Sequence, residues 1–182
     1  MPGTVTLSGP NCWVFRIDYS SHHWETVDYC RHGGATWETG GQIWQLWSIG
    51  PLQETNLTTM TCAPHAVSLP ATAVPGQVWH KRCAGASSAV KGAMVSAGTY
   101  RFVGPRTLTV GGRVVRSDEF VRQRTDTGAQ RGTERSEIWI DAASGLPIRL
   151  HRDIKVTTDT PFGTSTYTQS GLFNLVSPVA RS

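Results

Sequence analysis

The stretch Ser136–His151, with the sequence SEIWIDAASGLPIRLH, is the most regularly patterned part of this chain, and the rest is interpreted from it. Ile138 and Ile140 alternate with other side chains before the turn, and apolar residues alternate with polar ones after it. A period of two is typical of β-strands, because successive side chains point to opposite faces of a sheet. Gly145 can adopt the positive φ of a tight turn, and Pro147 is tolerated at a strand start. The stretch therefore predicts an antiparallel hairpin.

The alternation continues after the hairpin turn. Ile148, Leu150, Ile154 and Val156 share one face of the returning strand, and the residues between them are mostly charged or polar. Arg152 is the one residue that interrupts this apolar face. The pattern predicts a sheet with one face in the core and the other in water.

Upstream of the hairpin, Gly111 and Gly112 supply the positive φ angles that a two-residue turn between two further strands requires. Residues 99–178 are therefore expected to form an antiparallel meander with local connections. In the first half of the chain, residues 12–32 predict two strands with a turn near Ser20–His22.

Two segments are harder to interpret. Residues 42–50 fit either a strand or one to two turns of helix, because the run is too short to decide. Small residues and glycine dominate residues 84–98, which predict a loop with room for a short helix.

Together these patterns predict a mainly β protein, or a β-rich α+β protein, with a curved antiparallel sheet or half-barrel and a disulfide-stapled N-terminal part. At 182 residues the chain is expected to form a single domain, 1–182. Within it we expect a tryptophan- and cysteine-rich sub-region, 1–69, and the meander sub-region, 77–182, joined by residues 70–76.

The chain has four cysteines, and an even number in a turn-rich sequence indicates two disulfides. We favour the sequential pairs Cys12–Cys30 and Cys62–Cys83, because each pair brackets a predicted hairpin or loop. Two disulfides imply an oxidising compartment. The alternative is a zinc site, because Cys62, His65, His80 and Cys83 supply two thiolates and two imidazoles.

The sequence contains no apolar stretch as long as a membrane helix, and it opens without the basic start and apolar run of a signal peptide. The two predicted disulfides nevertheless lead us to expect an extracytoplasmic protein. It would be secreted, or anchored to a membrane through a segment that this sequence does not include.

Charge is distributed unevenly along the chain. Residues 1–80 carry two basic and five acidic side chains, whereas residues 81–182 carry fifteen basic and eight acidic ones. No run of five or more like charges occurs, so we expect no nucleic-acid partner. The motifs G-x-S-x-G and H-E-x-x-H and a phosphate-binding glycine loop are absent, so no reaction is indicated. We favour a non-enzymatic role and expect no cofactor.

Six of the seven tryptophans precede residue 80. Trp24, Trp37, Trp44 and Trp47 are candidates for lining an apolar groove or stacking on a ligand. Core filling is the alternative, because aromatic side chains bury large areas.

Asp18, His22, His23, Glu25 and Asp28 form a cluster in sequence that is suited to acid–base chemistry or metal binding. In an alternating strand, His23 and Glu25 would share a face. The polar end of a hairpin would account for the same residues without any chemistry.

Arg122 and Arg124 are candidates for binding an anionic ligand or a lipid headgroup. They belong to a group of arginines on neighbouring predicted strands that also includes Arg113, Arg116, Arg131 and Arg135. Acidic residues are interspersed among them, so a salt-bridged face is the alternative.

Residues 132–178, GTERSEIWIDAASGLPIRLHRDIKVTTDTPFGTSTYTQSGLFNLVSP, resemble uncharacterised exported or membrane-anchored proteins of high-GC Gram-positive bacteria. The hairpin is similar to one in LolA/LppX/RseB-like envelope proteins, and the resemblance covers roughly residues 99–178. It implies a half-barrel around an apolar hollow that holds lipid or senses envelope components. Helices plug the hollow in those proteins, and this sequence offers no good candidates for them.

We therefore expect an extracytoplasmic binding module for a lipid or another hydrophobic or amphiphilic small molecule. One alternative is an ectodomain that binds another envelope protein or the membrane surface. A second alternative is a hydrolase that uses the Asp18–Asp28 cluster.

Overall fold

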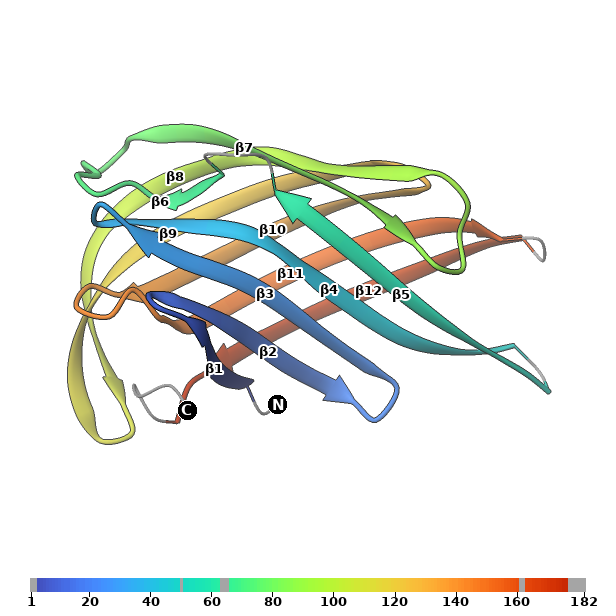
Figure 1. Cartoon of the computed structure of the whole chain (residues 1–182), viewed down its shortest axis with the longest axis horizontal. Coiled ribbons are helices and arrows are strands. Elements are labelled where there is room, and N and C mark those ends of the chain that lie inside the picture. Colours follow the sequence, from blue (N-terminus) through green and yellow to red (C-terminus); the bar gives the residue numbers. More distant parts are fainter. Residues whose placement is uncertain (1–2, 50, 63–65, 161–162, 177–182) are drawn as a thin grey trace.

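The computed structural model describes residues 3–49, 51–62, 66–160 and 163–176, and these ranges form an all-β protein (Figure 1). The strands are β1 (Gly3–Gly9), β2 (Cys12–Ser20), β3 (His23–His32), β4 (Ala35–Ile49), β5 (Leu52–Cys62), β6 (Val67–Leu69), β7 (Val78–Ser87), β8 (Ala93–Val110), β9 (Arg113–Gly128), β10 (Gln130–Asp141), β11 (Pro147–Thr160) and β12 (Gly163–Asn174). Within these ranges no helix is long and apolar enough to cross a membrane.

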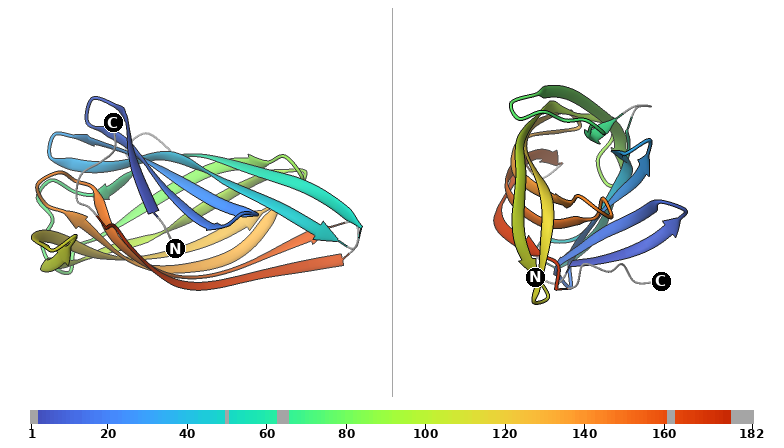
Figure 2. Two further views of the ribbon diagram at one scale, coloured as in Figure 1. Left: turned by 90° about the horizontal axis from the view of Figure 1, so that it is seen from below. Right: turned by 90° about the vertical axis from the view of Figure 1, so that its left-hand side faces the viewer.

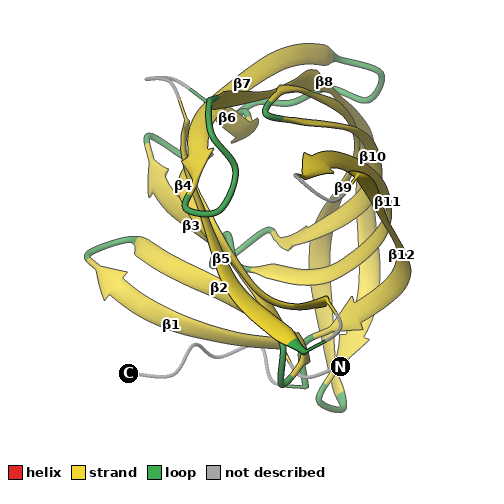
Figure 3. Cartoon of the chain, turned by 90° about the vertical axis from the view of Figure 1, so that its right-hand side faces the viewer, coloured by secondary structure: helices red, strands yellow, loops and turns green. Residues whose placement is uncertain are grey.

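One antiparallel sheet contains all twelve strands. Its order is β1-β2-β3-β4-β5-β7-β8-β9-β10-β11-β12, and the short β6 pairs with β4. The sheet curls into a nearly closed barrel, which the views along its long axis show as a ring of strands (Figures 2 and 3). In the described part of the chain, β1 and β12 form the two margins and have no ladder between them. The predicted fold class is confirmed, and the curvature goes further than a half-barrel.

The hairpin of the opening stretch is confirmed as β10 and β11. Ile138 and Ile140 are buried, and Trp139 lies on the other face beneath the Arg149 guanidinium, whose carbon is 5.6 Å from the ring centroid. Gly145 takes a φ of 78° in the turn.

The inward side chains form rows across neighbouring strands. One apolar row consists of Phe102, Phe120, Ile138, Leu150 and Phe173, which are directly opposite one another from β8 to β12. These five residues belong to the buried cluster that fills one end of the barrel, and we call this cluster the apolar plug. Its other buried members are Val5, Trp13, Phe15, Ile17, Tyr29, Leu69, Tyr100, Val110, Ile140, Leu146, Ile148 and Leu175.

The loop predicted for residues 84–98 is wrong, because these residues belong to β7 and β8 and to the turn between them. The small residues are needed for close strand approach. A Cβ on Gly85 would overlap the backbone oxygen of Thr59 on β5, and one on Gly98 would overlap that of Gln123 on β9. Glycine in a strand often marks such a contact. Of the undecided residues 42–50, residues 42–49 are the end of strand β4, and residue 50 lies outside the described residues.

Both predicted disulfides, Cys12–Cys30 and Cys62–Cys83, are present. Each joins residues directly opposite on neighbouring strands, β2 with β3 and β5 with β7. The pairs are consistent with an oxidising, extracytoplasmic environment.

The two sub-regions expected from the sequence contribute strands to the same sheet. Residues 70–76 lie between β6 and β7. The division at this segment stays a prediction.

Candidate functional site

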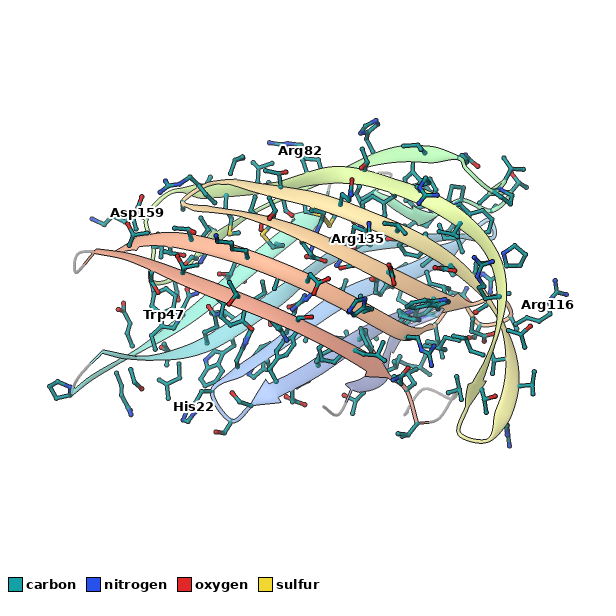
Figure 4. The ribbon with its side chains drawn as sticks, turned by 180° about the vertical axis from the view of Figure 1, so that it is seen from behind. His22, Trp47, Arg82, Arg116, Arg135 and Asp159 are labelled. Atoms are coloured by element: carbon teal, nitrogen blue, oxygen red, sulfur yellow. A yellow bond between two sulfur atoms is a disulfide. The ribbon has the colours of Figure 1, made fainter. Side chains whose placement is uncertain are left out.

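A cavity of about 620 Å³ lies at the end of the barrel opposite the apolar plug. Strands β3, β4, β5, β10, β11 and β12 form its walls. The lining residues are His22, His23, Glu25, Ile43, Gln45, Leu46, Trp47, Ser48, Thr58, Gln130, Arg152, Ile154, Val156, Thr158, Gly163, Thr164, Ser165, Thr166 and Tyr167. Figure 4 shows His22 and Trp47 at this end of the molecule and Arg116 at the other.

Glu25 and Arg152 form the floor of the cavity, next to the plug. Arg152 is only 2% exposed, and its Nη1 donates to both carboxylate oxygens of Glu25 at 2.7 and 2.8 Å. Its Nη2 donates to the Tyr19 hydroxyl and, at 3.1 Å, to Gln169 Oε1. The pair joins β3 to β11 across the barrel interior, between residues 127 positions apart in sequence. A buried charge needs such a partner.

His23 and Tyr167 form the polar side of the wall above this floor. The Tyr167 hydroxyl lies 3.2 Å from His23 Nδ1 and donates to Gln169 Oε1 at 2.9 Å. The His23 ring stacks on Tyr19, with 4.4 Å between ring centroids. Burial lowers the pKa of His23 and outweighs the opposite effect of Glu25, so the imidazole is neutral near pH 7.

The strands next to this polar side, β4 and β11, contribute apolar residues to the wall. Ile43, Leu46 and Trp47 come from β4, and Ile154 and Val156 come from β11. The cavity therefore has an apolar belt and a polar, hydrogen-bonded floor, which is the usual composition of a small-molecule site.

A second ionic group lies deeper in the barrel. Glu38 accepts from Lys81, and Glu134 accepts from Arg122 and Arg124. A cavity of about 80 Å³ separates part of this group from the floor, and Glu38, Arg124, Glu134, Glu25 and Arg152 all contribute to its lining. Burial alone would raise the pKa values of Glu38 and Glu134, but the neighbouring cations hold both below the usual range.

Of the four candidate tryptophans, Trp47 alone lines the large cavity in the described part of the chain. Trp24 and Trp44 are cross-strand neighbours that stack with 6.3 Å between ring centroids, and Arg16 lies over Trp24 at 4.5 Å. Trp37 is opposite Cys30 in the β3–β4 ladder.

The Asp18–Asp28 cluster is divided between the two faces of the sheet. His23 and Glu25 share the inner face, as the alternation predicts, and His22 lies at the cavity mouth. Asp18 instead pairs with the half-exposed Arg16 at 2.7 Å. Burial and the Glu38 charge raise the pKa of Asp28, which does not contribute to the cavity lining.

Arg122 and Arg124 lie inside the barrel in ion pairs and not on an outer basic patch. The zinc alternative is incompatible with this structure, because Cys62 and Cys83 are bonded to each other. His80 is exposed, and His65 lies outside the described residues.

Most of the cavity was not predicted from the sequence, including Tyr167, Gln130 and the floor residue Arg152. The interruption of the β11 apolar face at Arg152 was the available signal. Its partner Glu25 was noticed for a different reason, as part of the acidic cluster.

Comparisons with protein-family models, curated proteins and solved structures found no match to this chain.

Proposed function

We propose that this barrel is an extracytoplasmic binding protein for a lipid or another amphiphilic small molecule. One observation carries the proposal: a cavity of about 620 Å³ that combines an apolar belt with a polar floor formed by Glu25 and Arg152. Small-molecule sites typically measure about 300–1,000 Å³. A ligand with one apolar and one polar part matches this division.

The proposal extends the resemblance to half-barrel envelope proteins. In this chain, side chains of the strands fill one end of the interior, where helices plug the hollow of those proteins. The two disulfides fit an exported protein that is secreted or anchored.

A partner protein in the cell envelope is the second candidate. The Trp24–Trp44 stack with Arg16 favours it, because aromatic residues and arginine are enriched in protein interfaces. The divided Asp18–Asp28 cluster gives less support to a hydrolase.

The test is binding of a neutral fluorescent long-chain probe to the oxidised protein, purified without detergent. Val156→Trp fills the cavity and is expected to weaken binding at least about tenfold, because the apolar belt loses its space. Lys155→Trp adds the same side chain at the adjacent, exposed position of β11 and should leave affinity unchanged.

Native mass spectrometry of the same preparation reports any species carried through purification. A wild-type protein that does not bind the probe, or a Val156→Trp variant that binds it as well as Lys155→Trp does, would contradict the proposal.

A further inference from the structure

The charged groups inside the barrel balance. Between the apolar plug and the cavity mouth, four described carboxylates line the large cavity or the smaller one beside it: Glu25, Glu38, Asp126 and Glu134. The corresponding cations are Lys81, Arg122, Arg124 and Arg152. These cations form their described ion pairs with Glu25, Glu38 and Glu134, and Asp126, which lines the smaller cavity, brings the total to four negative and four positive charges.

This balance extends to the part of the interior that a ligand would touch. Glu25 and Arg152 neutralise each other on the floor at 2.7 Å. His23 carries no charge near neutral pH, because burial disfavours its imidazolium form. Among the described cavity-lining residues, no ionised group is left to compensate a charged ligand.

Hydrogen-bonding capacity is nevertheless left over at the same place. Gln130, Thr58 and Thr158 add amide and hydroxyl groups to the wall. These amide and hydroxyl groups can exchange hydrogen bonds with an uncharged oxygen-bearing head group, and they offer no charge to an ionic one.

We infer that the ligand of this cavity is a neutral amphiphile whose uncharged oxygen-bearing head group, a hydroxyl, ester or amide, lies at the Glu25–Arg152 floor with its apolar chain along the Trp47 side. This inference rests on the proposed function and specifies its ligand class. An ionic head of the same size would lose its hydration in a charge-balanced interior without gaining a counter-ion.

The experiment compares lauryl alcohol, laurate and laurylammonium, which share one alkyl chain and differ in head-group charge at neutral pH. Each competes with the neutral fluorescent probe for the oxidised full chain, below the concentration at which the ions form micelles. Lauryl alcohol is expected to bind at least about tenfold more tightly than either ion. Equal or tighter binding of laurate or laurylammonium overturns the inference while leaving the proposed function standing. If the probe itself does not bind, both fail.

Glu25→Gln provides a second readout because it leaves the Arg152 charge uncompensated. The ratio of laurate to lauryl alcohol affinity should then shift toward laurate by about tenfold. Asp153→Asn removes a carboxylate from the exposed face of the same β11 segment and should leave the ratio unchanged. An unchanged ratio in a folded Glu25→Gln variant contradicts the inference. If that variant does not fold, the wild-type comparison still decides.

Discussion

Arg152 occupies a position where a strand of this kind normally places an aliphatic residue. Its neighbours on the inner face of β11 are Leu150 and Ile154, and its guanidinium is almost completely removed from water. The desolvation cost is offset only because Glu25, Tyr19 and Gln169 all accept hydrogen bonds from it. The pair also ties β3 to β11, two strands that are far apart in the order of the sheet.

Arg152→Met is expected to lower the free energy of unfolding by about 3–5 kcal/mol, because Glu25 would be left buried without its cation. The double variant Arg152→Met/Glu25→Gln should lose less than the sum of the two single losses, since no uncompensated charge remains. Chemical denaturation of the oxidised proteins measures the free energies of unfolding of the two single variants and the double variant.

Arg135→Met is the matched control for this prediction. Arg135 lies on the outer face of β10, half exposed, and donates to Glu137 at 3.1 Å (Figure 4). Exposed pairs contribute about 0–1 kcal/mol. A loss in Arg152→Met that is no larger than in Arg135→Met would show that the Glu25 pair does not anchor the barrel.

The ladder between β5 and β7 is the shortest along the main path of the sheet in the described residues. It has five registered pairs, from Thr58 opposite Ser87 to Cys62 opposite Cys83. The disulfide closes this ladder at one end, next to the buried Glu38 and Lys81. The bond therefore secures the junction between the first five strands and the rest of the barrel.

Replacing both Cys62 and Cys83 by alanine should lower the free energy of unfolding by about 3 kcal/mol, because the unfolded chain gains loop entropy. It should also speed amide hydrogen exchange in β5 and β7 more than elsewhere. The Cys12–Cys30 disulfide closes a loop of similar length, with a sequence separation of 18 against 21. The Cys12→Ala/Cys30→Ala variant should therefore lose a similar amount of stability, but leave the hydrogen exchange of β5 and β7 unchanged. If the amides of β7 exchanged equally fast in both variants, the Cys62–Cys83 disulfide would not specifically stabilise the β5–β7 ladder.

Strand content was predictable where alternation was clean. The hairpin at Ser136–His151, the Gly111-Gly112 turn and the two cysteine pairs were all correct. Residues 84–98 were misassigned because strand propensity disfavours glycine and, to a lesser degree, alanine, whereas Gly85 and Gly98 are required by close contacts with neighbouring strands. These contacts depend on tertiary structure and leave no periodic signal in sequence.

The site was predictable only in fragments for a related reason. Alternation assigned His23 and Glu25 to one face, but it could not say that closure of the barrel places that face opposite β11. The interior is consequently arranged in layers that no local window reveals: an apolar plug, a balanced ionic middle and a cavity at the far end. Each layer combines residues from strands that are distant in sequence.

The ionic middle makes the stability of the whole barrel sensitive to acid. The folded-state pKa values of Glu38 and Glu134 lie below the ordinary glutamate value of about 4.3, because both face buried cations. Groups with a depressed folded pKa contribute stability that is fully present above the unfolded value and is lost as the pH falls through the folded one. Unfolding should therefore become easier below about pH 4.3, by about 1.4 kcal/mol per pH unit for each of these carboxylates.

Glu134→Gln isolates one of these contributions. At neutral pH the variant should be less stable, because Arg122 and Arg124 lose their shared carboxylate. Below about pH 4.3 its free energy of unfolding should fall less steeply than that of the wild type, by about 1.4 kcal/mol per pH unit. Denaturation curves across this pH range give the pH dependence of the free energy of unfolding for the wild type and for Glu134→Gln. The control Glu54→Gln, at an exposed position of β5, should keep the wild-type slope. Identical slopes for Glu134→Gln and the wild type would mean that the acid sensitivity arises outside the ionic middle.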